Sequence, residues 1–238
     1  PTRHTSISYD GNGVKIIRSK SDTRELPNVE CIAEEYIPFN KEISVIVARN
    51  LKGETSTYPV FEMEFHSEAN QVEYVICPAR ISKSIAEKAT SLAVNVSQKF
   101  NHIGLLAVEM FVTNDNDILI NEVAPRPHNS GHQTIEANYT SQFEQHLRAI
   151  LNLPLGSTEN KLCSVMVNLV GSEGHNGPVV YENIEKILSF DGVTPHIYGK
   201  KNTRPFRKMG HVTIINSSIE KAKTIAKKIK ESVKIISK

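Results

Sequence analysis

The chain has 238 residues, of which 39% are hydrophobic and 23% are charged, as is ordinary for a globular protein of one large or two modest domains. The formal net charge is +2, and residues 219–238 carry +5, so bulk charge does not indicate a nucleic-acid-binding protein. Cys31, Cys77 and Cys163 are far apart and form no CxxC motif, so the sequence suggests neither a disulfide framework nor a zinc knuckle.

No apolar run approaches the ~20 residues that a bilayer-spanning helix needs. The first residues also lack the charged-then-apolar pattern of a signal peptide. We therefore expect a cytoplasmic protein with no membrane partner and no nucleic-acid partner.

The sequence begins with a predicted hairpin. Residues 4–19 indicate a strand, a turn and a strand, because Asp10-Gly11 and Asn12-Gly13 supply the positive-φ positions that tight hairpins need. Glycines also let backbone N–H groups converge on an anion, so this turn is a weak candidate for phosphate binding. A simple hairpin turn is the alternative interpretation.

Strands and long helices follow. Apolar and β-branched residues predict strands over residues 32–48 with a break at Pro38, and over 55–65, 72–77, 105–112 and 118–123. Apolar residues at helical spacing predict helices over residues 84–100 and 141–151, the second ended by Pro154.

The pattern resets after residue 163. It predicts a strand over residues 164–171, a short helix near 184–188, strands near 196–198 and 211–215, and a last helix from Ser218. The lysines of this helix lie largely off its apolar stripe, which favours a packed helix over one that binds nucleic acid or membrane. These elements predict an α+β fold with antiparallel hairpins.

Two glutamates lie on one predicted hairpin. If its turn is symmetric about Asp115 and Asn116, Glu109 and Glu122 face each other directly. Cross-strand partners have Cβ atoms roughly 4.5–5.5 Å apart, where two like charges destabilise a sheet. A divalent cation would compensate, and carboxylate and phosphate oxygens are what Mg²⁺ prefers. The alternatives are that one or both side chains point to solvent, or that the register is shifted by one residue.

A polar loop follows this hairpin. Residues 120–137 read INEVAPRPHNSGHQTIEA. Pro125 and Pro127 have fixed φ and no N–H to donate, so the chain must leave the sheet there. Two histidines four residues apart would suggest a zinc pair on a helix, but the prolines and Gly131 oppose a helix. The sequence therefore favours a substrate loop rich in donors.

A basic cluster lies farther along, between Tyr198 and His211. It contains five cations between two glycines: Lys200, Lys201, Arg204, Arg207 and Lys208. Charge-assisted and bidentate contacts of this kind suit a phosphate monoester. A solvated basic turn is the alternative.

These motifs closely resemble those of N5-carboxyaminoimidazole ribonucleotide synthase, an ATP-grasp ligase of purine biosynthesis. The resemblance runs from about Tyr9 to His211 and includes the polar loop and the YGK, RP, RK and GH pattern of the basic cluster. It implies an ATP-grasp fold, with part of the lid subdomain in residues 1–36, the core in 37–154 and a small α/β C-terminal lobe in 155–238.

The resemblance also implies roles for individual residues. ATP and its phosphates would be held by Arg3, Tyr9, Asp10, Gly11, Gly13, Glu34, Glu35, Tyr36, Ile37, Glu42, His66, Asn121 and Glu122, and Mg²⁺ by Glu109 and Glu122. The substrate would be bound by Arg126, His128, Asn129, Ser130, Lys200, Arg204, Arg207 and Lys208. Catalysis would involve Arg126, His128, Asn129, Ser130 and His132.

The implied reaction uses ATP and Mg²⁺ to carboxylate 5-aminoimidazole ribonucleotide with bicarbonate. ATP phosphorylates bicarbonate, and the resulting carboxyphosphate delivers its carboxyl group to the exocyclic amine of the ribonucleotide. Mg²⁺ spreads the charge of the phosphoryl group in transit. The resemblance further implies a homodimer.

Three departures from the family pattern leave alternatives open. The family usually has a lysine where this chain has Arg3 and two glycines where it has Ile7-Ser8, and its amino-terminal domain is absent. The chain is then a fragment, a separated subunit or a remnant, and the 238 residues alone are expected to turn over poorly. The rival functions are another ATP-grasp ligase, of the glycinamide ribonucleotide transformylase or biotin carboxylase type, and a nucleotide-binding module without catalysis.

Overall fold

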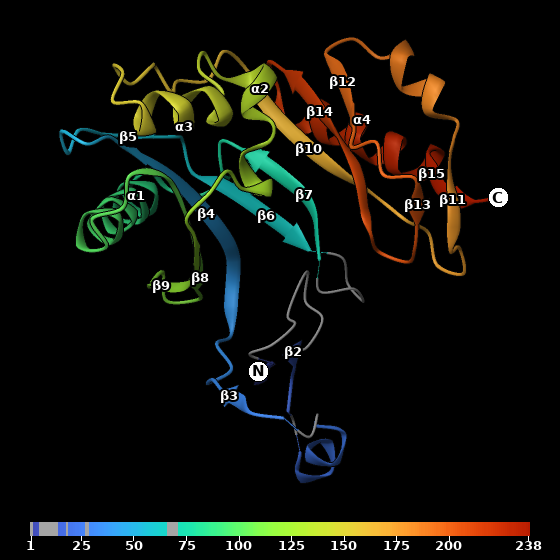
Figure 1. The fold of residues 1–238 in the computed structure, drawn as a ribbon, viewed down its shortest axis with the longest axis horizontal. Helices are drawn as coiled ribbons and strands as arrows, with labels where there is room; N and C mark the ends of the chain where they lie inside the picture. Colours follow the sequence, from blue (N-terminus) through green and yellow to red (C-terminus); the bar gives the residue numbers. More distant parts are fainter. Residues whose placement is uncertain (1, 5–13, 18, 27–28, 66–70) are drawn as a thin grey trace.

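A large antiparallel sheet runs through the molecule (Figure 1). The computed structural model describes residues 2–4, 14–17, 19–26, 29–65 and 71–238. Within these residues the large sheet has nine strands, in the order β12-β14-β10-β7-β6-β4-β8-β9, with β5 beside β4. They are β4 (Phe39–Arg49), β5 (Thr55–Thr57), β6 (Phe61–Phe65), β7 (Val72–Cys77), β8 (Gly104–Thr113), β9 (Ile118–Ala124), β10 (Cys163–Val170), β12 (Val193–Ile197) and β14 (Lys208–Asn216).

Two smaller sheets complete the described strands. One consists of β1 (Thr2–His4), β2 (Val14–Lys15) and β3 (Cys31–Ala33), and Figure 1 shows it projecting from one end of the molecule. The other consists of β11 (Gly177–Glu182), β13 (Asn202–Thr203) and β15 (Lys234–Ser237), beside the carboxyl-terminal part of the large sheet. The helices are α1 (Lys83–Lys99), α2 (Thr134–Ala137), α3 (Gln142–Ile150), α4 (Ile219–Ser232) and the 3₁₀ helices η1 (Lys20–Glu25), η2 (Asn129–Gly131) and η3 (Ile184–Ser189).

The middle of β4 is buried on both faces. Ile43, Val45 and Val47 form one core with α1, while Ile46 and Ala48 belong to a second core on the other face. Because successive strand residues point to opposite faces, a strand covered on both sides reads as a continuous apolar run. This explains why the predicted strand over 32–48 lacks a clean alternation, and the predicted break at Pro38 is confirmed between β3 and β4.

The long helices lie where the sequence predicts them. The N-cap of α1 is Ser82, whose hydroxyl oxygen accepts a hydrogen bond from the Ile85 backbone N–H, which satisfies one of the free donors of the first turn. Ala222, Ala226 and Ile229 of α4 are buried in the core beneath β10 and β14. The packed interpretation of the last helix is therefore confirmed. No helix among the described residues combines the length and apolar character needed to cross a bilayer.

Some elements differ from the prediction. The strand predicted over 55–65 is two strands, β5 and β6, because Pro59 lies between them and offers no N–H to a sheet ladder. The helix predicted at 184–188 is the 3₁₀ helix η3. Six short elements were not predicted: η1, η2, α2, β11, β13 and β15. At the hairpin predicted over 4–19, β1 and β2 are antiparallel partners, and Val14 pairs with Arg3, just before the predicted start. The turn lies outside the described residues.

Candidate functional site

The two predicted metal ligands face each other across the β8–β9 hairpin. Glu109 pairs with Glu122, as the sequence predicts. The uniform register assumed for that prediction is wrong, because Met110 faces Ile120 while Asn121 is left as an extra residue on β9. The strand therefore carries a β-bulge immediately before Glu122.

The bulge explains how the side chains of two neighbouring residues, Asn121 and Glu122, can lie on the same face of the sheet. In a regular strand Asn121 and Glu122 would point to opposite faces, whereas a bulge disturbs this alternation and re-aims a side chain. The Asn121 amide donates a hydrogen bond to the Glu42 carboxylate at 3.3 Å, and both residues line the same cleft as Glu122. Asn121 and Glu122 therefore both line one cleft, although they are neighbours in the strand.

A third candidate metal ligand, His128, lies beside the acid pair. One ligand atom each from Glu109, Glu122 and His128 lies within 4.8 Å of the other two. Burial and the positive charges of Arg126 and Lys208 lower the pKa of His128 to about 4, so the ring is neutral at pH 7 and one of its two nitrogens carries a lone pair. Two carboxylates with one neutral imidazole fit a divalent cation.

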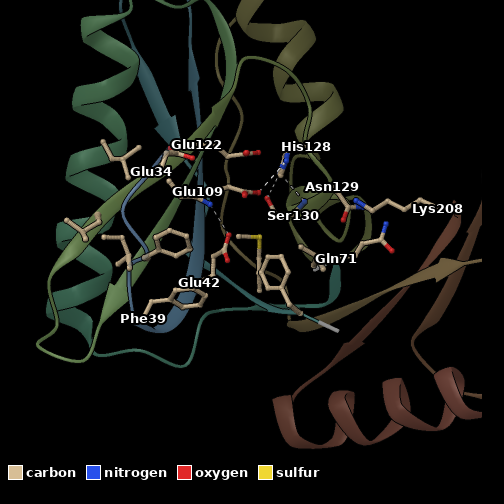
Figure 2. Close-up of a pocket in the computed structure, with 18 of the residues that line it drawn as sticks. Glu34, Phe39, Glu42, Gln71, Glu109, Glu122, His128, Asn129, Ser130 and Lys208 are labelled. Atoms are coloured by element: carbon tan, nitrogen blue, oxygen red, sulfur yellow. Dashed lines mark hydrogen bonds and ion pairs between the residues drawn. The ribbon is translucent and has the colours of Figure 1, made fainter. Parts of the chain in front are cut away.

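These residues lie in a cleft of about 820 Å³. Figure 2 shows Glu109, Glu122 and Glu42 pointing into it from the sheet, with His128 and Asn129 opposite. Its apolar part contains stacked rings, Phe39 on β4 and Phe111 on β8, with centroids 4.4 Å apart. The lining of the whole cleft also includes Glu34, Glu35, Tyr36, Ile37, Met63, Phe65, Leu119 and Ile120. The cleft thus joins an apolar end to an acidic centre.

The segment of residues 34–37, which is predicted to bind ATP, lines this cleft. Residues 34–37 connect β3 to β4, and Glu42 follows on β4 as a buried carboxylate. Sequence reasoning missed the two aromatic rings, although they are the apolar surface on which a planar base can stack. Phe111 is on the same strand as Glu109, two residues on, and this period-2 spacing was the signal available in the sequence.

The polar loop is fixed to the sheet beneath it. The chain leaves β9 after Ala124, as the two prolines predict. The Ser130 hydroxyl donates to the Ser44 hydroxyl at 3.0 Å and is 2.9 Å from His128 Nδ1. The side-chain oxygen of Gln142 accepts a hydrogen bond from the backbone N–H of His128, and its side-chain nitrogen donates one to the backbone carbonyl of His128. Gln142, which sequence reasoning missed, therefore clamps the loop from α3.

Gln142 also sets the tautomer of His132. The side-chain oxygen of Gln142 accepts from the backbone N–H of His128, which fixes the orientation of the Gln142 amide. The atom of Gln142 that lies 2.9 Å from His132 Nδ1 is therefore Nε2, which can only donate a hydrogen bond. His132 Nδ1 thus has no proton, and the neutral ring carries its hydrogen on Nε2. Burial and the nearby charge of Lys208 lower the pKa of His132 to about 4, so this neutral form prevails at pH 7.

His132 belongs to a column of rings. Its ring centroid lies 4.9 Å from that of His211, which stacks on His196 at 4.4 Å. Phe143 of α3 also stacks on His132, with centroids 5.7 Å apart. Since His196 and His211 are paired residues of β12 and β14, this column joins the polar loop to the carboxyl-terminal strands.

Gly131 allows the loop to approach the sheet. A Cβ atom there would lie 2.4 Å from Ile46 Cδ1 and 2.7 Å from Gln142 Oε1. We predict that Gly131→Ala lowers the free energy of unfolding by about 1–3 kcal/mol, the usual cost of overpacking. Urea denaturation measures this change. Gly174→Ala is the comparison, because its Cβ would meet nothing within 4 Å and only backbone strain is added. Equal losses in both variants would contradict a crowding effect.

The basic cluster divides between the cleft and the surface. Lys200 and Lys208 line the cleft, and the Lys200 ammonium lies 5.7 Å from the Tyr198 ring centroid and donates to the Lys208 carbonyl. Arg204 and Arg207 are not among the lining residues, and Arg207 donates to the Asn202 carbonyl. The structure therefore brings two of the four predicted phosphate ligands to the site.

The remaining predicted residues are placed as follows. Arg126 is exposed at the cleft, and its guanidinium donates to the Pro127 carbonyl. Arg3 lies on β1, paired with Ile32 of β3. Outside the described residues are Tyr9, Asp10, Gly11, Gly13 and His66.

Comparison with known proteins identifies the family. An ATP-grasp domain model matches residues 2–143, and a model of the phosphoribosylaminoimidazole carboxylase C-terminal domain matches residues 164–225. N5-carboxyaminoimidazole ribonucleotide synthase of Bacillus subtilis is 43% identical over 211 residues, 87% of this chain. Because the match covers 53% of that relative, the chain spans about half its length.

Solved structures give the same result. N5-carboxyaminoimidazole ribonucleotide synthetase from Thermotoga maritima superposes with a TM-score of 0.89 at 46% identity, over 95% of this chain and 61% of that one. The Aspergillus clavatus synthase in complex with ADP and 5-aminoimidazole ribonucleotide has a TM-score of 0.83 at 33% identity, over 93% and 59%. The fold and the resemblance predicted from the sequence are thereby confirmed, and the chain belongs to the ATP-grasp family.

Proposed function

We propose that this chain is the ATP-grasp and C-terminal part of an enzyme that carboxylates 5-aminoimidazole ribonucleotide with bicarbonate at the expense of ATP. The relatives from Bacillus subtilis and Thermotoga maritima bear the name of this synthase or synthetase, and the Aspergillus clavatus structure is a complex with ADP and this ribonucleotide. The product is N5-carboxyaminoimidazole ribonucleotide, an intermediate of purine biosynthesis.

The acid pair is the observation that carries this proposal. Glu109 is only 8% exposed and faces Glu122 on a sheet, where two like charges are unfavourable without a cation. Mg²⁺ bound there, with triphosphate oxygens completing its ligands, would neutralise charge on the phosphoryl group in transit. Glu109, Glu122 and His128 are the residues that would hold it.

The two ends of the cleft suit two different substrates. The stacked rings of Phe39 and Phe111 offer the adenine base an apolar surface, and the Glu42 carboxylate can accept hydrogen bonds from ribose hydroxyls. Lys200 and Lys208, at the same cleft, are suited to the 5-phosphate of the ribonucleotide. The acid pair and the polar loop would then hold the reacting groups.

The proposed reaction has two steps. A bicarbonate oxygen attacks the γ-phosphorus of ATP, and ADP leaves. The exocyclic amine then attacks the carboxyl carbon of carboxyphosphate, inorganic phosphate leaves and the amine loses a proton. Because carboxyphosphate reacts with water, this reaction requires that water be excluded from the cleft while the intermediate is present. The neutral ring of His132 would add no positive charge and could donate a hydrogen bond from Nε2 to the reacting groups.

Substrate-stimulated ATP hydrolysis tests this proposal. In the intact protein with Mg²⁺ and bicarbonate, we expect 5-aminoimidazole ribonucleotide to increase the rate of ADP release at least about tenfold, because the reacting amine completes the site. Glycinamide ribonucleotide should not do so. Stimulation by glycinamide ribonucleotide alone would indicate another ATP-grasp ligase, and nucleotide binding without any stimulated hydrolysis would indicate a binding module.

The homodimer and the domain boundaries stay predictions.

A further inference from the structure

A buried asparagine of the carboxyl-terminal strands contacts the polar loop. Asn168 lies on β10 and is 8% exposed. Its amide nitrogen donates to Asn129 Oδ1 at 3.0 Å, and its oxygen accepts from Asn129 Nδ2 at 2.9 Å. Two amides joined by two hydrogen bonds in this way hold each other in one plane, so β10 is coupled to a side chain that lines the cleft.

A backbone carbonyl fixes the direction of this pair. Asn168 Nδ2 also donates to the Val72 carbonyl at 2.9 Å, and a carbonyl can only accept. Turning the Asn168 amide over would place its oxygen against the Val72 oxygen. Since Asn168 cannot turn over, Asn129 cannot either, because its nitrogen must meet the Asn168 oxygen. The orientation of the Asn129 amide is therefore set by β7, through Asn168.

The fixed amide has a definite hydrogen-bonding capacity left over. Each primary amide offers two N–H donors and two oxygen lone pairs. Asn168 uses one N–H and one lone pair of Asn129. One donor and one acceptor remain, in fixed positions, for a ligand in the cleft.

We propose that Asn168 is a positioning residue that fixes the Asn129 amide to receive the nucleotide substrate carrying the reacting amine. This inference rests on the proposed function for the identity of the substrate. It assigns to the C-terminal domain a part in orienting the polar loop, separate from the lysines at the substrate phosphate. Asn168 itself touches no substrate and acts through Asn129.

A second asparagine provides a matched control. Asn138 is fully buried, and its amide likewise donates to a carbonyl, that of Thr158, and to another asparagine, Asn160 Oδ1. It does not line the cleft. Asn138→Leu therefore removes comparable buried hydrogen bonds without changing Asn129.

The first test measures substrate affinity in the intact protein by calorimetry. In Asn168→Leu, or in the smaller Asn168→Ala if the leucine variant does not fold, we expect the Kd for 5-aminoimidazole ribonucleotide to rise about tenfold. The Kd for ATP should stay within about twofold of the wild-type value, because Asn168 is proposed to affect only the binding of the ribonucleotide. Asn138→Leu should lower the melting temperature without changing either Kd.

A double-mutant cycle separates positioning from general destabilisation. If Asn168 acts through Asn129, then Asn168→Leu should raise the ribonucleotide Kd no further in an Asn129→Ala background. Additive rises in the two variants, or an unchanged Kd in a folded Asn168 variant, would overturn the inference.

The second test needs no substrate. In NMR spectra of the unliganded protein, the side-chain amide protons of Asn129 should exchange slowly with solvent and show cross-relaxation with those of Asn168. Asn168→Leu, which removes the oxygen that accepts from Asn129, should abolish this protection. Rapid exchange in the wild type would refute the inference. If the amides are protected but the ribonucleotide does not bind, the proposed function fails while the orientation of Asn129 by Asn168 stands.

Discussion

Replacing Glu122 by glutamine is expected to lower magnesium-dependent turnover by a factor of about 10²–10³, the usual loss when one preorganised electrostatic group of an active site is removed. Glutamine keeps the size of the side chain but has no charge. Its NH₂ group cannot ligate a cation, and the pair with Glu109 loses one of its two negative charges. Initial rates of ADP release over a series of Mg²⁺ concentrations measure the effect.

The same variant should be slightly more stable without Mg²⁺. Glu109 no longer faces a like charge, and relief of such a cross-strand pair is worth roughly 0.2–1 kcal/mol. A loss of activity combined with a gain in unfolding free energy cannot arise from misfolding. Asp117→Asn is the matched control, since it removes an exposed carboxylate near the turn of the same hairpin and should leave the turnover unchanged. Wild-type turnover in Glu122→Gln would contradict the metal site.

Mild acid is expected to destabilise the protein. Burial lowers the pKa of three histidines, to about 4 for His128 and His132 and to about 3 for His211, whose ring is 3% exposed. An unfolded chain has histidines near the reference value of 6.5, so it binds more protons than the folded chain below that pH. The free energy of unfolding is therefore fully present above pH 6.5 and falls as the pH decreases toward 3.

Between pH 6.5 and 5, the protonation of histidines can be separated from that of carboxylates. Each histidine can contribute up to roughly 2 kcal/mol over that interval. Carboxylates such as Glu62 take up protons at lower pH. Burial by itself raises the pKa of Glu62, but hydrogen bonds from Arg80 and Lys41 outweigh burial and hold this pKa below the reference value of 4.5. Its contribution to stability is lost only at lower pH.

Urea midpoints at pH 7 and pH 5 measure the change. In the wild type the midpoint should be clearly lower at pH 5. His211→Phe keeps a flat ring in the column and removes one titrating group, so its midpoint should depend less steeply on pH. Equal midpoints at the two pH values in the wild type would show that the buried rings are already protonated in the folded protein.

Part of this architecture is local and could be predicted. The helices α1, α3 and α4 were predicted within about two residues because helical period, N-caps and Pro154 act over short distances along the chain. Pro125 and Pro127 likewise fix where β9 ends. The pairing of Glu109 with Glu122 was predicted correctly, but on the assumption of a uniform register that the bulge disproves.

The short strands show where local signals are insufficient. β13 has two residues, and β11 and β15 pair with each other across more than fifty residues of sequence. Strands so short contain no periodicity to detect, and their pairing depends on partners that the sequence does not bring near. The same is true of Arg204 and Arg207, whose placement outside the cleft depends on how the basic turn packs.

The sequence by itself determined the chemical inventory of this protein: two acids on one hairpin, a loop forced off the sheet by prolines, a basic cluster and the motifs of its family. Only the tertiary structure decided how these groups are aimed. The bulge turns Asn121 toward Glu42, Gln142 fixes the two loop histidines, and Asn168 fixes Asn129. The physical reason is that a hydrogen bond is directional and its partner can lie anywhere in the sequence, whereas backbone preferences act between neighbouring residues.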